Sequence, residues 1–216
     1  MSLRATSSTS DKTRQKIVRA AEQLFADKGY QSMTLRDVTK AANVNLAAVN
    51  YHFGSKCNLM REAIRSRIEP INVERLKRLA ELIEAHGPAP VPVSAIFNSL
   101  FRPLFESDGP SKGPNPALIQ MIGRAFTEPA DFMRNLHKDF FTELSFRYLT
   151  ELKRTCPQLD EETIRYRFFL SISTMLGATI NTVTLENLSS SKSTEPNYDK
   201  IVSELIAYAA AGFDHA

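Results

Sequence analysis

The segment from Asn45 to Lys56 brings together side chains that suit contact with nucleic acid. Asn50 lies near its middle, and an asparagine amide can pair with the N6 and N7 atoms of adenine. Leu46 and Ala47 precede it, and small apolar groups can pack on the methyl group of thymine. These three residues are the candidates for contact with base edges, and they predict a site weighted toward A and T. The alternative for Leu46 and Ala47 is plain helix packing.

Residues that could catalyse a reaction or hold a metal form no recognisable pattern. Cys57 and Cys156 lack the spacing of a disulfide framework or a zinc site, and His86, His137 and His215 are scattered along the chain. The sequence contains no GxSxG, HExxH, GxGxxG or GxxxxGK[ST] motif. No catalytic residue, metal or cofactor is therefore expected, and a helical enzyme is the disfavoured alternative.

Charge is unevenly spread along the 216 residues, whose net charge is +3. The first 56 residues carry nine Lys and Arg against four acids, which leaves the remainder slightly acidic. A basic module of this kind suits a phosphate backbone, although a solvated basic face has the same composition. The isolated thiols, and the absence of a signal peptide or of any apolar run of about 18 residues, predict a cytoplasmic protein without membrane association.

Three short helices are expected to position these side chains. Residues 1–10 are a polar leader that is predicted to be disordered. Apolar periodicity and cap residues place the helices at residues 11–29, 34–41 and 45–52. Thr34 and Asn45 are the N-cap residues of the second and third helices. Because two short helices joined by a tight turn form a helix-turn-helix, residues 11–56 are predicted to be a DNA-binding domain.

The sequence KAANVNLAAVNYHFGSK, from Lys40 to Lys56, resembles the recognition region of TetR-family regulators. The preceding AAEQLFADKGYQSMTLRDVTKAA, from Ala20 to Ala42, is similar to the first two helices of that family. The resemblance implies a ligand-responsive transcriptional regulator that binds a palindrome-like operator in double-stranded DNA as a homodimer. It also implies that four residues contact DNA phosphates, namely Thr34, Tyr51, His52 and Lys56.

Residues 57–216 are predicted to form an all-helical body for ligand sensing and dimerisation. Apolar periodicity gives helices at 93–106, 117–126, 129–154, 161–186 and 198–213, with loops at 86–92, 107–116 and 189–195. No segment alternates as a strand would. Pro70 interrupts the helix that follows the recognition region, so it must kink or split that helix. The whole chain is expected to be all-α, with about nine helices.

The body is rich in long and aromatic apolar side chains, which are core residues by default. Because the resembled family places an effector pocket in this bundle, some of them are expected to line a pocket. The candidates are Phe97, Leu100, Phe101, Leu104, Phe140, Phe141, Phe169, Ile172, Met175 and Leu176. Small residues on the last two long helices are candidates for a four-helix dimer interface, with intrachain packing as the alternative; they are Gly177, Ala178, Ala207 and Ala211.

The recognition region also bears on the effector. Within the family, the sequence VNLAAVNYHFGSK, Val44 to Lys56, is most similar to regulators of fatty-acid breakdown. This implies a repressor that a long-chain fatty acid or acyl thioester releases from its operator, and a flat aromatic or drug-like molecule is the next candidate. A DNA-binding architectural protein without an effector is the remaining alternative.

Overall fold

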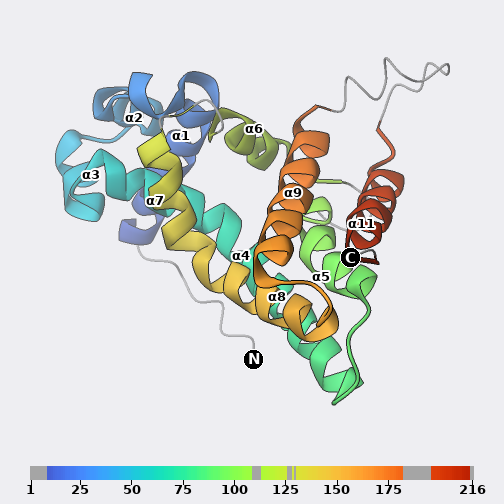
Figure 1. Ribbon diagram of the computed structural model, residues 1–216. Helices are drawn as coiled ribbons and strands as arrows, with labels where there is room; N and C mark the ends of the chain where they lie inside the picture. The colour runs from blue at the N-terminus through green and yellow to red at the C-terminus, as the bar shows by residue number, and fades with distance from the viewer. Residues whose placement is uncertain (1–8, 109–112, 126–127, 129, 182–195, 215–216) are drawn as a thin grey trace, which may run out of the picture.

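The computed structural model describes residues 9–108, 113–125, 128, 130–181 and 196–214. All regular structure in these residues is helical, which confirms the predicted all-α fold (Figure 1). The described helices are α1 (Thr9–Ser32), α2 (Leu35–Ala42), α3 (Leu46–Phe53), α4 (Lys56–His86), α5 (Val93–Phe105), α6 (Pro116–Ala125), α7 (Ala130–Phe140), α8 (Thr142–Thr155), α9 (Glu161–Ile180) and α11 (Tyr198–Asp214). These are ten helices in the described residues, where about nine were expected.

The helix-turn-helix is set by local capping. Thr34 opens α2 with a capping box, in which its hydroxyl accepts from the Asp37 N–H while the Asp37 carboxylate accepts from the Thr34 N–H. Asn43 ends α2 in the left-handed conformation, with φ at 52°. Asn45 then opens α3, because its side-chain oxygen accepts from the Ala48 N–H at 2.8 Å. The predicted turn between the two helices is therefore confirmed.

A small apolar core holds these three helices against the start of α4. Val49 and Phe53 point inward from α3, and Phe25 of α1 is fully buried among the same cluster. The other buried members in this part of the chain are Ile17, Val18, Ala21, Met33, Val38, Ala42, Leu59, Met60 and Ala63. Because α3 is anchored on its inner face, the orientation of its outer face is fixed.

Helix α4 belongs to both parts of the molecule. It packs on α1 and α3 in the N-terminal part and on α5, α7 and α8 in the body. The helix runs for 31 residues and passes through Pro70 without a break, so Pro70 does not split it. The boundary predicted after residue 56 therefore lies at the start of a helix that continues from the N-terminal helices into the body.

The body is built around α5, which packs against α4, α8 and α11 (Figure 1). Phe97 of α5 is fully buried, with its ring centroid 5.3 Å from that of Phe101 and 5.4 Å from that of Phe213 in α11. Helices α9 and α11 pack on each other and α6 packs on both α1 and α9. The body thus contacts the N-terminal helices through α4 and through α6, and α7 packs on α4.

The single helix expected at 129–154 is in fact two helices. Phe141 separates α7 from α8 with φ −123° and ψ −10°, values outside a regular helix. The Phe140 carbonyl accepts a hydrogen bond from the Asn72 side chain at 2.8 Å, and the Thr142 hydroxyl turns back toward the carbonyls of the last turn of α7. These bonds replace the continuation of the helix, because side-chain donors there compete with the backbone ladder.

Two other expectations differ at the edges. Helix α1 begins at Thr9, two residues before the predicted start, and the rest of the expected leader, residues 1–8, lies outside the described residues. The helix expected at 161–186 is described as far as Ile180, and the loop expected at 189–195 lies outside the described residues. Among the helices that the structure describes, none is long and apolar enough to cross a membrane.

Candidate nucleic-acid interface

The outer face of α3 presents the residues predicted to contact bases. Leu46 is 44 % exposed, and Ala47 and Asn50 are exposed beside it. Val49 and Phe53, on the opposite face, are 1 % and 8 % exposed. A helix whose N-terminal part is exposed and whose inner face is locked by packing has the geometry of a recognition helix for the major groove.

Tyr51 and His52 extend this face toward the C-terminal end of α3. Tyr51 is 83 % exposed, the highest value among the large apolar and aromatic side chains of the described residues. Its ring meets the half-buried His52 ring edge-on, with centroids 5.2 Å apart. The tyrosine hydroxyl therefore lies at the surface and is free to reach a phosphate, while the contact with His52 restrains the ring.

Lys56 is held in place by the last residues of α1. Its Nζ lies 4.5 Å from the centroid of the Tyr30 ring and 3.4 Å from the Gln31 carbonyl oxygen. A cation above an aromatic face is stabilised by the negative electrostatic potential on that face of the neutral ring. Burial raises the pKa of Tyr30, so its hydroxyl stays neutral under the ammonium group at physiological pH. The charge of Lys56 is thus preorganised at the first turn of α4.

Thr34 is exposed at the N-terminus of α2, where backbone N–H groups favour an anion. Its hydroxyl is already engaged, because it accepts from the Asp37 N–H at 3.1 Å and donates to the Asp37 carboxylate at 2.9 Å. The hydrogen bonds from Thr34, led by the one from its backbone N–H, lower the pKa of Asp37. A phosphate at this helix end would therefore meet a carboxylate held nearby by the capping box.

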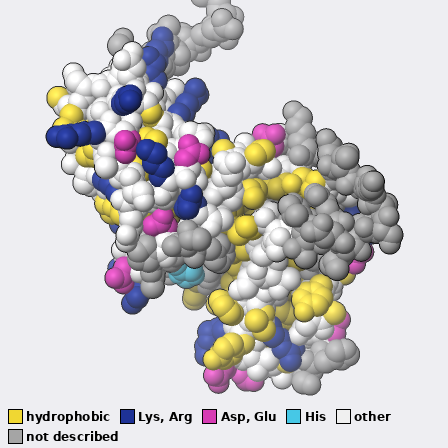
Figure 2. All heavy atoms as spheres, turned by 90° about the horizontal axis from the view of Figure 1, so that it is seen from above, with side chains coloured by type: hydrophobic (Ala, Val, Ile, Leu, Met, Phe, Trp, Pro, Cys, Tyr) yellow, Lys and Arg dark blue, Asp and Glu magenta, His cyan; other side chains and the backbone are white. Residues whose placement is uncertain are grey.

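Two exposed basic residues of α2, Arg36 and Lys40, were not among the predicted contacts. Arg36 lies in the first turn of α2 and Lys40 in its last turn. Their basic side chains on the helix before the recognition helix were a signal in the sequence that could have identified them. Figure 2 shows Lys and Arg side chains gathered over the half of the molecule that holds α1–α3, with hydrophobic side chains more frequent on the other half. The structure brings the α3 candidates onto one face, and it places Thr34 at the start of the neighbouring helix.

A buried carboxylate joins α1 to α4. Glu22 is 6 % exposed, and its carboxylate accepts from the Arg67 side chain at 2.6 and 3.1 Å. The Ser66 hydroxyl donates to the same carboxylate at 2.9 Å. This group connects the scaffold of the recognition helix to the helix that enters the body.

The end of α1 is joined to the α6 region. The backbone of Gly29, with φ 78° and ψ 170°, interrupts the regular helix of α1. Arg124 donates to the Asp27 carbonyl at 2.6 Å and to the Ala26 carbonyl at 3.3 Å, so a cation caps the part of α1 that ends before Gly29. Glu128 accepts from the Tyr30 N–H at 2.6 Å. Gly29 between them has φ at 78°, and a Cβ there would lie 2.4 Å from the Glu128 carboxylate. Two contacts thus hold the N-terminal helices against α6.

The predicted pocket residues separate into three groups. Phe97, Leu100, Phe101, Leu104 and Met175 are buried in the core. Phe140, Phe141, Ile172 and Leu176 are half-buried at its edge. Phe169 is 63 % exposed on the outer face of α9, because it lies one residue beyond the buried Phe168, and in the single chain its ring points away from the interior.

The predicted dimer residues lie on an apolar outer face of α9 and α11. Gly177, Ala207 and Ala211 are exposed, whereas Ala178 packs against the core. The large side chains on the same two helices are exposed by 40 to 70 %; they are Tyr166, Phe169, Leu170, Ile180 and Tyr208. We name this set of exposed residues, small and large, the α9/α11 face.

Comparison with known families gives two matches that together cover most of the chain. Residues 17–63 match the family described as bacterial regulatory proteins of the TetR family, and residues 98–212 match the tetracyclin repressor-like C-terminal domain. The second match alone covers more than half of the chain. The first match ends inside α4, in agreement with the dual role of that helix.

Individual relatives are more distant. The biofilm operon negative transcriptional regulator IcaR of Staphylococcus aureus (strain Newman) is 24% identical over 122 residues, which cover 56% of this chain and 58% of IcaR. The chain thus spans little more than half the length of that relative. The transcriptional regulator SrpR of Pseudomonas putida is 31% identical over 71 residues, which cover 33% of each chain.

Solved structures share the fold over nearly the whole length. The fatty acid degradation regulator FadR from Bacillus halodurans has a TM-score of 0.63 at 14% identity, covering 92% of this chain and 98% of FadR. NalD of Pseudomonas aeruginosa, the secondary repressor of a multidrug efflux pump, has a TM-score of 0.59 at 19% identity, covering 94% and 97%. With its helix-turn-helix, its helical body and both family matches, the chain belongs to the TetR family of DNA-binding transcriptional regulators, which are not enzymes.

Proposed function

We propose that the chain is a repressor that binds a palindrome-like operator as a homodimer and leaves it when a small apolar ligand occupies the body. The observation that carries the proposal is the outer face of α3. Leu46, Ala47 and Asn50 are exposed there, while Val49 fixes the helix from its inner side. The face offers one hydrogen-bonding amide and two apolar groups, which suits adenine and thymine edges in the major groove.

The proposed contacts divide into two classes. Asn50 reads a base, so its loss should relax preference at one position of the site. Lys56, Tyr51, His52 and Thr34 bind phosphates, so their loss should weaken binding to all sequences alike. Lys56 carries the main charge of this set, and its contact with the Tyr30 ring keeps that charge in place.

The α9/α11 face supports a second copy of the chain as partner. Monomeric proteins seldom expose several large apolar side chains together, and a twofold dimer buries the same face on both subunits. Space next to Gly177 is open, since a Cβ there would meet no atom within 4 Å. Close approach of another helix is therefore sterically allowed at that point. A twofold dimer would also present two copies of α3 to successive turns of a palindrome.

The body supports an apolar effector. Its core contains Phe97, Leu100 and Phe101, with Phe140 and Phe141 at the edge. Long-chain fatty acids or acyl thioesters are the class we favour, because each buried methylene contributes about 0.8 kcal/mol in such surroundings. FadR, whose fold this chain shares, is a fatty acid degradation regulator. Release requires that the ligand bind better to a state in which the two recognition helices no longer match the DNA.

The operator is found by selection of bound duplexes from random DNA, followed by light scattering of the protein with and without the selected site. We expect an A/T-weighted palindrome and a dimer on it. Tight binding of a monomer to a single half-site would contradict the proposal.

The effector is tested by titrating fatty acids and acyl thioesters of increasing chain length into the complex of protein and labelled operator. Fluorescence anisotropy should fall as DNA is released, and the midpoint should move to lower ligand concentration as the chain lengthens. Release by an aromatic compound alone, with no effect of any acyl compound, would rule out the acyl class. Failure of every ligand to release DNA would favour an architectural protein.

A further inference from the structure

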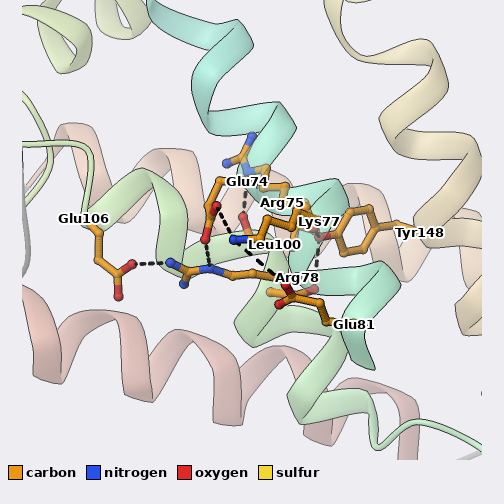
Figure 3. Close-up of polar contacts among 9 residues, drawn as sticks. Glu74, Arg75, Lys77, Arg78, Glu81, Leu100, Glu106 and Tyr148 are labelled. Atoms are coloured by element: carbon orange, nitrogen blue, oxygen red, sulfur yellow. Dashed lines mark hydrogen bonds and ion pairs between the residues drawn. The ribbon is translucent and has the colours of Figure 1, made fainter. Parts of the chain in front are cut away.

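A buried cation lies inside the body without a carboxylate partner. Arg75 of α4 is 5 % exposed, and among the described residues no Asp or Glu lies within ion-pair distance of its guanidinium. The nearby acids are already used: Glu74 and Glu106 both bind the side chain of Arg78, at 2.7 and 2.8 Å (Figure 3). The charge of Arg75 is thus uncompensated by any acid in the described part of the chain.

The guanidinium is only partly satisfied by neutral groups. Its Nε donates to the Leu100 carbonyl at 2.7 Å, and its Nη1 donates to the Asn72 side-chain oxygen at 3.1 Å. The third nitrogen, Nη2, donates no hydrogen bond to the described part of the chain. Because no buried side-chain nitrogen there is left without a partner, Nη2 reaches solvent. Burial lowers the pKa of Arg75 to about 10, so the group still carries its charge at neutral pH.

Polar groups gather around this arginine at the crossing of α4, α5 and α8. The Tyr148 hydroxyl donates to the Arg75 carbonyl at 3.0 Å and lies 3.0 Å from the Ser99 hydroxyl. Tyr148 is fully buried, and burial raises its pKa to about 12, so it stays a neutral donor. Apolar Phe97, Leu100 and Phe101 occupy the same helix as Ser99. The result is a small polar cluster with one positive charge in an otherwise apolar interior.

A buried charge without a counter-ion costs free energy, because it has lost most of its water and gained no opposite charge. An apolar residue of similar size would spare the protein this cost. An anion that entered the cluster would repay it, since hydrogen bonds to a charged group in a desolvated site are strong. The energetics therefore favour a ligand that brings a negative charge.

Helix α7 ends beside this cluster. Asn72, which holds Arg75, also donates from its amide nitrogen to the Phe140 carbonyl at the end of α7. Of the α7 side chains that are described, none is buried, and only Leu136 and Phe140 are half-buried. Helix α7 is also joined to α4 by the ion pair between Asp139 and Arg61 at 2.6 Å. The end of α7 thus lies beside the cluster, next to the aromatic residues at the α7–α8 break.

We propose that Arg75 binds the anionic end of the effector, so that the effector is an apolar molecule with a free carboxylate at one end. The apolar part would then lie among the phenylalanines of α5 and of the α7–α8 junction. This inference rests on the proposed function, in which a ligand of the body releases DNA. It adds a chemical requirement that an apolar pocket alone does not impose.

The position of Arg75 also gives the ligand a route to the DNA-binding helices. Arg75 and Lys56 lie on the same uninterrupted helix, α4. Ligand contacts that draw Arg75 away from the Leu100 carbonyl would change how α4 sits on α5. Such a change favours one arrangement of α4 over another, which is the differential binding that release requires.

The test compares dodecanoate, dodecan-1-ol and dodecanoyl-coenzyme A by isothermal titration to the full-length protein. The alcohol removes the charge and keeps the chain, and the thioester replaces the carboxylate by distant phosphates. The variants are Arg75→Met, which is neutral and similar in length, and Arg75→Lys, which keeps the charge. Arg78→Met is the matched control, because Arg78 lies one turn further along α4 and already pairs with Glu74 and Glu106. Thermal unfolding checks that each variant is folded, and Arg75→Met should melt no lower than wild type.

We expect wild type and Arg78→Met to bind dodecanoate about 10-fold or more tightly than the alcohol, a ratio that corresponds to about 1.4 kcal/mol. Arg75→Met should lose this preference, and Arg75→Lys should keep part of it. Each of four results would overturn the inference. Wild type could bind the acid and the alcohol equally well, or Arg75→Met could keep the wild-type preference. The thioester could bind more tightly than the acid, or dodecanoate could fail to bind. DNA release is measured separately: binding that requires Arg75 but leaves the operator complex intact supports the inference and contradicts the proposed release.

Discussion

The buried contact between Glu22 and Arg67 gives a sharp test of how the N-terminal helices are held on α4. Replacing Arg67 by Met removes two hydrogen bonds, at 2.6 and 3.1 Å, from a carboxylate that is nearly inaccessible to water. Breaking a fully buried pair costs about 3–5 kcal/mol, because one charge is left without a partner. Here the Ser66 hydroxyl remains bound to Glu22, and the Arg67 side chain is 35% exposed, so the cost is smaller. We expect a loss of about 2–3 kcal/mol in the free energy of unfolding.

The double variant Glu22→Leu/Arg67→Met should recover most of that loss, because no unpaired charge stays in the core. Urea unfolding of wild type, both single variants and the double variant, at one protomer concentration, gives the coupling energy. We expect the coupling to be about 2 kcal/mol, and Arg67→Met to lower the melting temperature by about 4–10 °C. Strictly additive losses, with no coupling between the two positions, would refute the description of Glu22 and Arg67 as a buried pair that joins α1 to α4.

Three further predictions address other contacts. The capping box lowers the pKa of Asp37, so the contribution of the Asp37 carboxylate to stability is present above the ordinary pKa of 3.8 and is lost as pH falls through the lowered value. Asp37→Asn should therefore be less stable than wild type at pH 7 and equally stable in strong acid. A stability difference that stays constant at all pH values would contradict this. Arg124→Met should lower the free energy of unfolding in urea by about 1 kcal/mol, because the Ala26 and Asp27 carbonyls of α1 lose a charged donor. The variant should also speed amide hydrogen exchange at Tyr30, and unchanged exchange would show that Arg124 does not hold this part of α1. Ala207→Glu places a charge on the α9/α11 face and should yield monomers in light scattering with unchanged helix content, whereas an intact dimer would place the interface elsewhere.

The helix-turn-helix was predictable because its determinants are local. Thr34 and Asn45 cap the two short helices through bonds to residues three positions ahead, and such spacings are visible in the sequence. The inward side of α3 also follows from periodicity alone, since Val49 and Phe53 lie one turn apart. Exposure of Leu46, Ala47 and Asn50 followed directly from this assignment.

Features that depend on distant partners were not predictable. The break at Phe141 depends on Asn72, which reaches the Phe140 carbonyl from 68 positions earlier in the chain. Arg75 looks like a surface residue in an amphipathic helix, and only the packing of α5 and α8 against α4 buries it. Phe168 and Phe169 are adjacent and chemically identical, but only Phe168 is buried. If the helical periodicity is assigned one residue out of register, Phe169 is predicted to be the buried ring instead.

The central claim is that the outer face of α3 reads bases while Lys56 binds the backbone. It is tested most directly by measuring the affinity of wild type, Asn50→Ala and Lys56→Ala for the selected operator and for its single-base variants across a range of salt concentrations. Asn50→Ala should lose about 1–3 kcal/mol on the operator, lose discrimination at one base position and keep the wild-type salt slope. Lys56→Ala should weaken binding to every sequence by a similar factor and flatten the salt slope by about one charge per subunit. Loss of discrimination in both variants to the same degree, or in neither, would contradict the account.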